Sequence, residues 1–352
     1  MGQSIAVIPG DGIGTEVVGA TRRVLDVVAE VHGLDLRYDE YDWSCRRYAE
    51  TGAMMPDDAL ETLAKYDAIL LGAVGWPGVP DHVSLWGLLI PIRRHFRQYV
   101  NQRPIAVFDG VESPLRDARP GEVDLVVIRE NVEGEYSEMG GRLNRGFPDE
   151  LAVQESVFTR AGVGRIADHA FELARHRAGY LTSATKSNGI VHTLPFWDEV
   201  MAERAAAYPD VRWDAEHIDA LAAKVVLEPE RFDVIVASNL FGDILSDLTA
   251  AVAGSIGIAP SANLDPTREN PSMFEPVHGS APDIAGRRLA NPVGTLWSAA
   301  MMLDHLGHEE AAADLMEGIR ESLRIPATRT RDLGGTALTE DVTDTVVGHL
   351  RR

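Results

Sequence analysis

Short apolar runs alternate with longer amphipathic stretches along most of the chain. The short runs predict strands, and apolar positions that recur every three or four residues between them predict helices. The first such pair is a strand over Ser4–Ile8 followed by a helix whose apolar face includes Val17, Val24 and Leu25. Buried strands separated by helices indicate a largely parallel α/β sheet that is covered on both faces.

The same alternation continues beyond the first helix. Further strands are predicted near residues 34–42, 68–71, 125–128, 180–185 and 232–237. Helices are predicted after Pro56 and over residues 85–100, 160–177, 195–208, 292–306, 309–323 and 339–352, the last one capped by Thr339.

Two stretches depart from this rhythm. Residues 134–154 are polar and carry glycines, which indicates a β-ribbon that projects from the body. Residues 252–291 are rich in proline and glycine, which indicates a long functional loop region.

Length and charge restrict the class of protein. The chain has 352 residues, which suggests two domains at roughly 100–200 residues each. With 33 basic and 54 acidic residues its formal net charge is −21. Nucleic acids and anionic membrane surfaces attract basic faces, so neither is expected as a partner.

Cysteine usage and the absence of an apolar leader indicate a cytoplasmic protein. Cys45 is the only cysteine, so an intrachain disulfide or a cysteine-based metal centre is excluded. The segment before Pro9 lacks the basic region of a signal peptide. The longest uncharged run, residues 248–264, is too short for a membrane span and contains Pro260.

A glycine-rich turn follows the first strand. Gly10, Gly12 and Gly14 have the wrong spacing for a dinucleotide-binding fingerprint, which requires G-x-G-x-x-G. We therefore predict a tight strand–helix turn there.

A pair of aspartates is the first candidate for metal binding. Asp243 and Asp247 follow the strand at 233–237 and are four residues apart, so both carboxylates point the same way on a helix. Without a basic partner at that spacing they repel each other, and Mg²⁺ or Mn²⁺ would relieve the repulsion. A solvated helix face is the alternative.

Other residues are candidates for binding anions and for transferring protons. Arg93, Arg103 and Arg129 supply guanidinium groups that can each hold a carboxylate, although surface ion pairs are the alternative. Lys186, one of only three lysines, ends an apolar strand and becomes a general base where nearby cations lower its pKa. Tyr136, in the predicted ribbon, can supply a proton.

Three motifs together resemble the β-decarboxylating dehydrogenases, the isocitrate and isopropylmalate dehydrogenase family. These motifs are IPGDGIG near the start, NLFGDILSD in the middle and EPVHGSAPDIAG near the end. The resemblance covers essentially the whole chain. Within the family, the segments YDWSC, TGAMMPDD, GAVGWP and PDHVSLWG are most similar to the branch that acts on tartrate and D-malate.

The resemblance implies a fold and a domain arrangement. The fold would be isopropylmalate-dehydrogenase-like α/β, with a large mixed or parallel sheet flanked by helices, and not a Rossmann fold. A nucleotide-binding domain would comprise residues 1–100 and 255–352. A substrate and dimerisation domain would comprise residues 101–254 and carry the β-ribbon at about 134–155.

The resemblance also assigns roles to residues of this chain. Arg93, Arg103 and Arg129 would bind substrate carboxylates, Tyr136 would protonate the enol, and Lys186 would handle the hydroxyl proton. Asp219, Asp243 and Asp247 would bind Mg²⁺ or Mn²⁺, with Lys186 and Asp219 serving the partner subunit of an obligatory homodimer. His278, Gly279, Ser280, Ala281, Asp283 and Asn291 would bind NAD. Asp283 stands where NADP-dependent relatives carry lysine, which favours NAD, and a requirement for K⁺ is left open.

The expected reaction is the oxidation of a C4 2-hydroxy dicarboxylate, D-malate to pyruvate and CO₂ or tartrate oxidation. Trp86 is expected to fill the space that larger substituents need, although an ordinary core aromatic is the alternative. The alternative reactions are those of a 3-isopropylmalate dehydrogenase and of a metal-dependent phosphate-ester hydrolase. A non-catalytic anion-binding module would need only the arginines.

Overall fold

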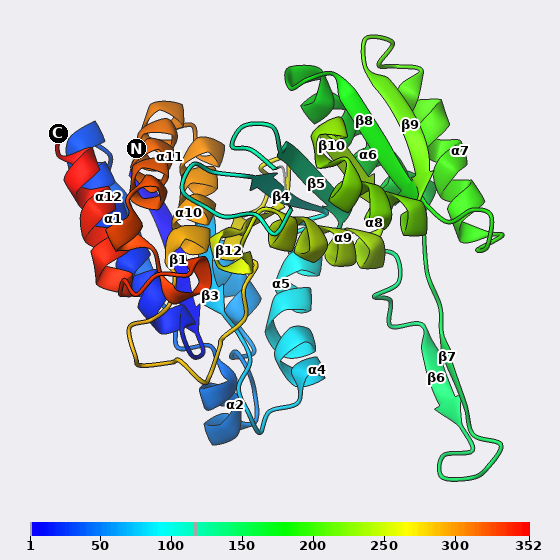
Figure 1. Ribbon diagram of the computed structural model, residues 1–352. Helices are drawn as coiled ribbons and strands as arrows, with labels where there is room; N and C mark the ends of the chain where they lie inside the picture. The colour runs from blue at the N-terminus through cyan, green and yellow to red at the C-terminus, as the bar shows by residue number, and fades with distance from the viewer. Residues whose placement is uncertain (1, 116–117) are drawn as a thin grey trace. The chain divides into compact units, whose positions relative to one another are not determined.

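The computed structural model describes residues 2–115 and 118–352 (Figure 1). Contacts within the chain divide it into two units, which are described separately. The first unit comprises residues 1–98, 103–123 and 250–352, and the second comprises residues 99–102 and 124–249. The strand β4 (Val100–Ala106) contains a boundary between them.

The first unit contains a mixed sheet. Its strands lie in the order β2 (Leu36–Glu40), β1 (Gln3–Gly10), β3 (Ala68–Ala73), β12 (Ser272–Pro276) and β11 (Pro260–Leu264). The first four strands are parallel, and β11 is antiparallel to β12. β3 pairs with β12 in register Ala68 to Ser272, so distant parts of the sequence form the centre of this sheet.

Helices cover both faces of this sheet because its side chains alternate between two apolar cores. Ile5, Val7 and Leu70 point into one core, and Ala6, Ile8 and Ile69 point into the other. The first core is completed by α1 (Gly14–His32), α10 (Val293–His305), α11 (Glu309–Arg324) and α12 (Thr339–Leu350). The second is completed by residues of α2 (Cys45–Thr51), α3 (Ala59–Leu63), the π-helical turn η1 (Leu85–Leu89) and α5 (Ile90–His95), with α4 (Asp81–Ser84) beside them.

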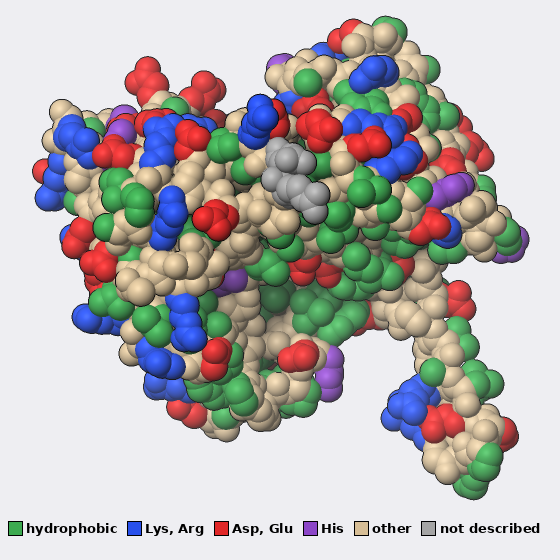
Figure 2. All heavy atoms as spheres, in the orientation of Figure 1, with side chains coloured by type: hydrophobic (Ala, Val, Ile, Leu, Met, Phe, Trp, Pro, Cys, Tyr) green, Lys and Arg blue, Asp and Glu red, His purple; other side chains and the backbone are tan. Residues whose placement is uncertain are grey.

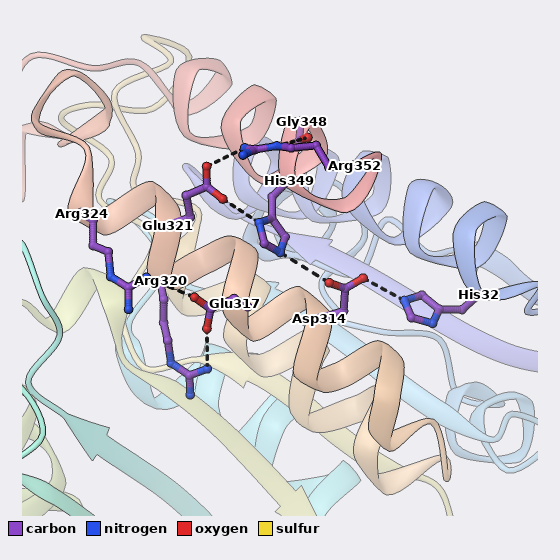
Figure 3. A network of polar contacts seen from close by, with 9 residues as sticks. All are labelled: His32, Asp314, Glu317, Arg320, Glu321, Arg324, Gly348, His349 and Arg352. Carbon is purple, nitrogen blue, oxygen red and sulfur yellow. Dashed lines mark hydrogen bonds and ion pairs between the residues drawn. The ribbon is translucent and has the colours of Figure 1, made fainter.

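Polar contacts join three helices of the first unit at their outer side (Figure 3). Asp314 of α11 lies 3.0 Å from His32 Nε2 of α1 and 3.5 Å from His349 Nε2 of α12. His349 Nδ1 also lies 2.6 Å from Glu321 Oε2, and Arg352 donates to Glu321.

The second unit contains a parallel sheet. Its strands lie in the order β5 (Asp124–Glu130), β10 (Val234–Ala237), β8 (Tyr180–Thr185) and β9 (Arg212–His217). The helices α6 (Arg160–His176), α7 (Thr193–Ala205) and α8 (Ile218–Leu227) pack against these strands, and α9 (Asn239–Val252) follows β10 directly. The predicted parallel α/β organisation is thus confirmed in both units, apart from antiparallel β11.

The predicted β-ribbon is also confirmed. The strands β6 (Gly140–Leu143) and β7 (Leu151–Gln154) pair antiparallel as a separate two-stranded sheet (Figure 1). Every residue of both strands is exposed, and hydrophobic side chains lie along the ribbon in Figure 2. The exposed apolar residues of the ribbon are Met139, Leu143, Phe147, Leu151 and Val153.

Two predicted element boundaries are wrong. Residues 252–291 are not one long loop, because the short apolar runs around Ala262 and Phe274 form the buried strands β11 and β12. Residues 85–100 are not one helix. Pro91 has no N–H to bond the preceding turn, a π-helical turn lies before it, and Arg97 has a φ of +52° where the chain leaves the helix.

The predicted cap of the last helix is wrong as well. The hydroxyl of Thr339 donates to the carbonyl of Ala290 at 2.7 Å and does not cap α12. The carboxylate of Asp341 accepts from the N–H of Leu338 at 2.8 Å in its place. None of the helices in the described ranges is long and apolar enough to cross a membrane.

Candidate functional site

The second unit places a carboxylate, an arginine and a tyrosine in direct contact. Arg129 is the penultimate residue of β5, and its guanidinium donates to the carboxylate of Asp243 on α9. The hydroxyl of Tyr136 donates to the other oxygen of the same carboxylate at 2.9 Å. Three residues that sequence analysis selected for different roles therefore meet at Asp243.

Asn239 fixes the orientation of Arg129. Its amide oxygen accepts from Nε of Arg129 at 3.0 Å and from Nη2 at 2.6 Å, while its amide nitrogen donates to the carbonyl of Glu133. The side chain of Arg129 is 3% exposed, so the guanidinium is held by these bonds away from bulk solvent. Sequence analysis gave Asn239 no role, although its place at the end of β10 was a signal.

The first turn of α9 is held by a second residue that sequence analysis missed. Glu135 accepts from the hydroxyl of Ser238 at 2.8 Å and from the N–H of Leu240 at 3.0 Å. A carboxylate at a helix N-terminus satisfies free N–H groups there. Glu135 thereby fixes the start of the helix that carries Asp243 and Asp247.

A buried acid supports the end of β5. Glu130 is fully buried and accepts from the N–H groups of Asn131, Val132 and Glu133 at 2.9–3.0 Å. Burial raises the pKa of its carboxyl to about 7, against the nearby charge of Arg165 and these N–H groups, which lower it. These bonds hold the turn that directly follows β5.

Asp243 and Asp247 lie one turn apart on α9, as predicted. The side chain of Asp243 is 34% exposed, and Asp247 is exposed. No basic residue stands at that spacing on the helix, but Arg129 from β5 forms an ion pair with Asp243 and supplies the positive charge. A metal at this carboxylate would have to share or displace that ion pair.

Lys186 and Asp219 form a separate pair in the second unit. Lys186 follows β8 directly, and its Nζ lies 2.6 Å from Oδ1 of Asp219 in the first turn of α8. This hydrogen bond lowers the pKa of Asp219, with a smaller contribution from the charge of Lys186. Both side chains reach solvent, with 29% and 67% of their surfaces exposed.

Within residues 2–115 and 118–352 of one chain, no three His, Cys, Asp or Glu side chains are placed to hold a metal ion together. The set Asp219, Asp243 and Asp247 stays a prediction. Its carboxylate oxygens are the ligands that Mg²⁺ and Mn²⁺ prefer.

In the first unit, the glycine-rich turn holds the predicted nucleotide loop, residues 278–291. Gly12 has a φ of +56°, and a Cβ there would lie 2.0 Å from the carbonyl oxygen of Ser280. The same carbonyl accepts from the N–H of Ile13 at 2.8 Å. The prediction of a tight strand–helix turn is confirmed, and its glycines permit close contact between two loops.

Residues of the nucleotide loop differ in burial, hydrogen bonding and backbone conformation. Nε2 of His278 is buried and has no hydrogen-bond partner among the described residues, and burial lowers the pKa of its imidazole. Ala281 has a φ of +39°, a backbone conformation that is strained for a residue with a Cβ. Asp283 and Gly279 are exposed, and Ser280 is buried.

Asn291 is the last residue of the nucleotide loop, and both the nitrogen and the oxygen of its side-chain amide form hydrogen bonds. It donates to Asp332 at 3.0 Å and accepts from the N–H of Val293 at 3.0 Å. Asn291 therefore anchors the loop to the start of α10.

Arg93 is buried in the first unit beside an acid. Its Nη2 donates to Glu275 at 2.7 Å, and Asn263 donates to the same oxygen at 2.7 Å. Nε of Arg93 is buried and has no hydrogen-bond partner among the described residues. Arg103, on β4, is likewise buried.

Trp86 lies in the π-helical turn and is partly exposed. The guanidinium carbon of Arg94 lies 5.0 Å from the centre of its ring. Trp86 does not belong to either apolar core of the first unit. Both interpretations of Trp86, a ring that fills the substrate pocket and an ordinary core aromatic, stay predictions.

Comparisons with known proteins agree with this fold. A family model described as isocitrate/isopropylmalate dehydrogenase matches residues 4–346. The isocitrate dehydrogenase from Methylococcus capsulatus has a similar structure, with a TM-score of 0.89 and 32% identity. That match covers 99% of this chain and 100% of the other, and it confirms the isopropylmalate-dehydrogenase-like fold.

Two sequence relatives are more similar. The probable tartrate dehydrogenase/decarboxylase of Bacillus subtilis is 55% identical over 350 residues, which covers 99% of this chain and 98% of that protein. The D-malate dehydrogenase (decarboxylating) of Escherichia coli is 54% identical and covers 97% of each chain. Enzymes of the matching family generally use NAD and a divalent metal. The chain belongs to the isocitrate/isopropylmalate dehydrogenase family.

Proposed function

We propose that this protein oxidises and decarboxylates a C4 2-hydroxy dicarboxylate, with NAD and Mg²⁺ or Mn²⁺ as cofactors. D-malate would give pyruvate and CO₂, and tartrate would be a further substrate. The contact of Arg129 and Tyr136 with Asp243 is the observation that carries this proposal. It unites an anion-binding group, a proton donor and a metal-binding carboxylate. The names of the two 54–55% identical relatives support the same reaction.

The arginines supply the positive charge that a dianionic substrate needs. In a chain of net charge −21, Arg93, Arg103 and Arg129 are buried, so their guanidinium groups are shielded from water. Guanidinium groups bind carboxylates through two parallel hydrogen bonds, which fixes orientation as well as charge. Arg129 would exchange its bond to Asp243 for one to the substrate when Asp243 binds the metal.

The residues present fit a hard divalent cation. Asp243 and Asp247 present carboxylates from one helix, and Asp219 would add a third from the partner subunit. When bound, the metal polarises the C2 oxygen of the substrate, and NAD accepts the hydride from C2. Removal of the metal would leave Asp243 paired with Arg129.

Two side chains would move the protons. Lys186 would take the hydroxyl proton at C2 as C2 loses its hydride and becomes a ketone carbon, and bound NAD would accept that hydride. The bond from C3 to its carboxylate then breaks, and CO₂ leaves without its bonding electrons. Tyr136 donates a proton to C3, so D-malate and NAD⁺ give pyruvate, CO₂ and NADH with no net uptake of protons.

The nucleotide loop fits NAD. The buried, unbonded Nε2 of His278 and the strained backbone of Ala281 are features that a bound group would use. The exposed carboxylate of Asp283 would accept ribose hydroxyls and repel a 2′-phosphate. The first unit would therefore be the nucleotide-binding domain, and the second the substrate and dimerisation domain.

Trp86 would restrict the substrate to small acids. A partly exposed ring beside Arg94 is placed to meet a ligand, whereas a core ring is not. The ring would exclude the branched side chain of isopropylmalate and the third carboxylate of isocitrate.

A second copy of this chain would complete the site. Lys186 and Asp219 form their own pair, apart from the contacts of Asp243. The exposed apolar side chains of the ribbon would be covered by the partner's ribbon. K⁺ as an additional activator and a cytoplasmic location stay predictions.

An absorbance assay for NADH tests the proposal. Purified protein is mixed with NAD and Mn²⁺ and offered D-malate, the tartrates, isopropylmalate or isocitrate in separate reactions. NADH formation with D-malate or a tartrate, lost on addition of a chelator, is expected. NADH from isopropylmalate alone would establish the alternative dehydrogenase, and no NADH from any acid would overturn the proposal.

A further inference from the structure

The turn after β5 connects a buried acid to the arginine of the proposed site. Glu130 is fully buried and accepts hydrogen bonds at 2.9–3.0 Å from three consecutive N–H groups, those of residues 131–133. A carboxylate inside a protein is stable only where donors satisfy its oxygens. The position of this turn and the charge of Glu130 therefore depend on each other.

The last residue of this turn contacts the amide that orients Arg129. The carbonyl oxygen of Glu133 accepts from Nδ2 of Asn239 at 3.0 Å. Oδ1 of the same amide accepts from Nε of Arg129 at 3.0 Å and from Nη2 at 2.6 Å. Because a side-chain amide is planar, its nitrogen cannot move without moving its oxygen. A shift of the turn therefore changes the hydrogen bonds that hold the guanidinium of Arg129.

Packing directs such a shift towards Asn239. On one side of the turn, the carboxylate of Glu133 accepts from the N–H and the hydroxyl of Thr159 at 2.8–2.9 Å, which ties the turn to the start of α6. On the other side, a Cβ at Gly134 would lie 3.3 Å from Cβ of Asn239. The turn therefore touches Asn239 by close packing as well as by a hydrogen bond.

Charged neighbours of Glu130 come from α6 and from the turn itself. Nη2 of Arg165, on α6, lies 3.6 Å from the carboxylate of Glu130 and 4.0 Å from that of Glu133. Burial raises the pKa of Glu130 to about 7, although the charge of Arg165 opposes this rise. His169, one turn further along α6, is uncharged at this pH, because burial lowers its pKa to about 4. The charge of Glu130 therefore changes near neutral pH.

We propose that Glu130 is a positioning residue for the proposed dehydrogenase reaction, on which this inference rests. Its ionised carboxylate holds the turn, the turn holds Asn239, and Asn239 presents the guanidinium of Arg129 to a substrate carboxylate. A proton on Glu130 would turn one of its oxygens into a donor among N–H donors, which loosens the turn. Substrate affinity would then fall in acid without a change at any group that touches the substrate.

The pH dependence of KM and kcat for D-malate tests this coupling. In the wild-type protein KM is expected to rise about tenfold as the pH falls from about 8 to about 6, the change that one titrating group produces. The effect on kcat is expected to be smaller, because a group that binds substrate and transition state alike acts on KM. Glu130→Gln should have the high KM throughout, since an amide neither ionises nor accepts N–H groups on both sides. An unchanged pH dependence in Glu130→Gln would overturn the proposal.

Substitution of Arg165 gives a test that keeps Glu130 in place. Arg165→Gln removes the cation that lowers the pKa of Glu130, so KM should begin to rise at a higher pH. Arg165→Lys retains the charge and should restore the wild-type profile. Arg160→Gln is the matched control, since Arg160 is on the same helix and pairs with Glu199 and Glu203 at 2.5–2.6 Å. A profile that stays in place in Arg165→Gln, or moves equally in Arg160→Gln, would contradict the assignment.

NMR of the arginine Nε–H groups without substrate separates this coupling from the dehydrogenase reaction. The Nε–H of Arg129 donates to Asn239, so its resonance is expected to shift with a midpoint near neutral pH in the wild-type protein and not in Glu130→Gln. If the wild-type protein shows this shift but forms no NADH from any acid, the coupling stands and the reaction fails. An Arg129 resonance that does not respond to pH near neutrality would overturn the coupling, whatever the activity.

Discussion

The ammonium of Lys186 lies 2.6 Å from the carboxylate of Asp219. The pair joins a proposed general base to a proposed metal ligand. The hydrogen bond from Lys186 therefore lowers the pKa of Asp219 before substrate binds.

Lys186→Met is expected to reduce the rate of NADH formation by about 10²- to 10⁴-fold, the usual contribution of a general base. It should also raise the pKa of Asp219 towards its ordinary value of 3.8, because the hydrogen bond from Lys186 is the main cause of its lowering. Carbon-detected NMR of the aspartates measures that pKa. Lys65→Met is the matched control, and comparable loss of activity there would contradict the role of Lys186.

Asp243→Asn is expected to abolish the rise in melting temperature that Mn²⁺ produces in the wild-type protein. A ligand that binds only the folded state raises its stability, and the neutral amide is a poor ligand for a hard cation. Calorimetry with and without Mn²⁺ measures the difference. Asp42→Asn is the control, and a Mn²⁺ response that survives in Asp243→Asn would rule out this aspartate as a ligand.

Trp86→Ala is expected to shift the ratio of kcat/KM for D-malate over isopropylmalate by roughly 10- to 200-fold towards isopropylmalate. This range is the change in selectivity expected when one bulky apolar group no longer matches its pocket. Steady-state kinetics with both acids measures the ratio. Trp43→Phe, in the apolar core, serves as a control for general loosening of the fold. An unchanged ratio in Trp86→Ala would show that the ring does not select the substrate.

Two inactive variants are expected to recover activity when refolded together. Lys186→Met and Tyr136→Phe subunits would form mixed dimers in which one site holds both defects and the other holds none. Random pairing then restores about a quarter of the wild-type sites. Lys186→Met mixed with Asp219→Asn is the control, because each site would retain one defect. Equal recovery in both mixtures, or none in the first, would contradict shared sites.

The contacts of Glu321 make part of the stability depend on pH (Figure 3). The hydrogen bond from Arg352, followed by that from His349, lowers the pKa of Glu321 below its ordinary 4.5. A lowered folded-state pKa stabilises the protein above the unfolded pKa, and this contribution is lost as pH falls through the folded value. The melting temperature of Glu321→Gln should therefore lie below wild type at neutral pH and converge with it in acid. Glu122→Gln should match wild type throughout, and a constant deficit in Glu321→Gln would contradict the linkage.

The pattern of apolar residues correctly predicted elements whose positions depend on nearby sequence. β8 begins and ends where its apolar run does, and α9 begins directly after β10, so Asp243 and Asp247 share a helix face. The ion pair of Asp243 was missed because Arg129 lies 114 residues away in sequence. Only the pairing of β10 with β5 brings that residue near.

β11 and β12 are strands that the sequence did not predict. β11 and β12 are short and lie among prolines and glycines, and their burial comes from α10 and β3. Their apolar runs are no longer than those of many loops. Site roles came from the family motifs rather than from periodicity, and they stay predictions where no contact tests them.

The pairing of β3 with β12 determines which of the two units can finish folding first during synthesis. Residues 124–249 of the second unit have emerged before Ser272, the first residue of β12, has been synthesised. At about 5–20 residues per second, Ala68 waits roughly 10–40 s for its neighbour in the sheet. The first unit, which contains the N-terminal residues, is therefore the last to be completed. Until β12 has been synthesised, β3 has an unpaired edge that nascent-chain chaperones would have to protect.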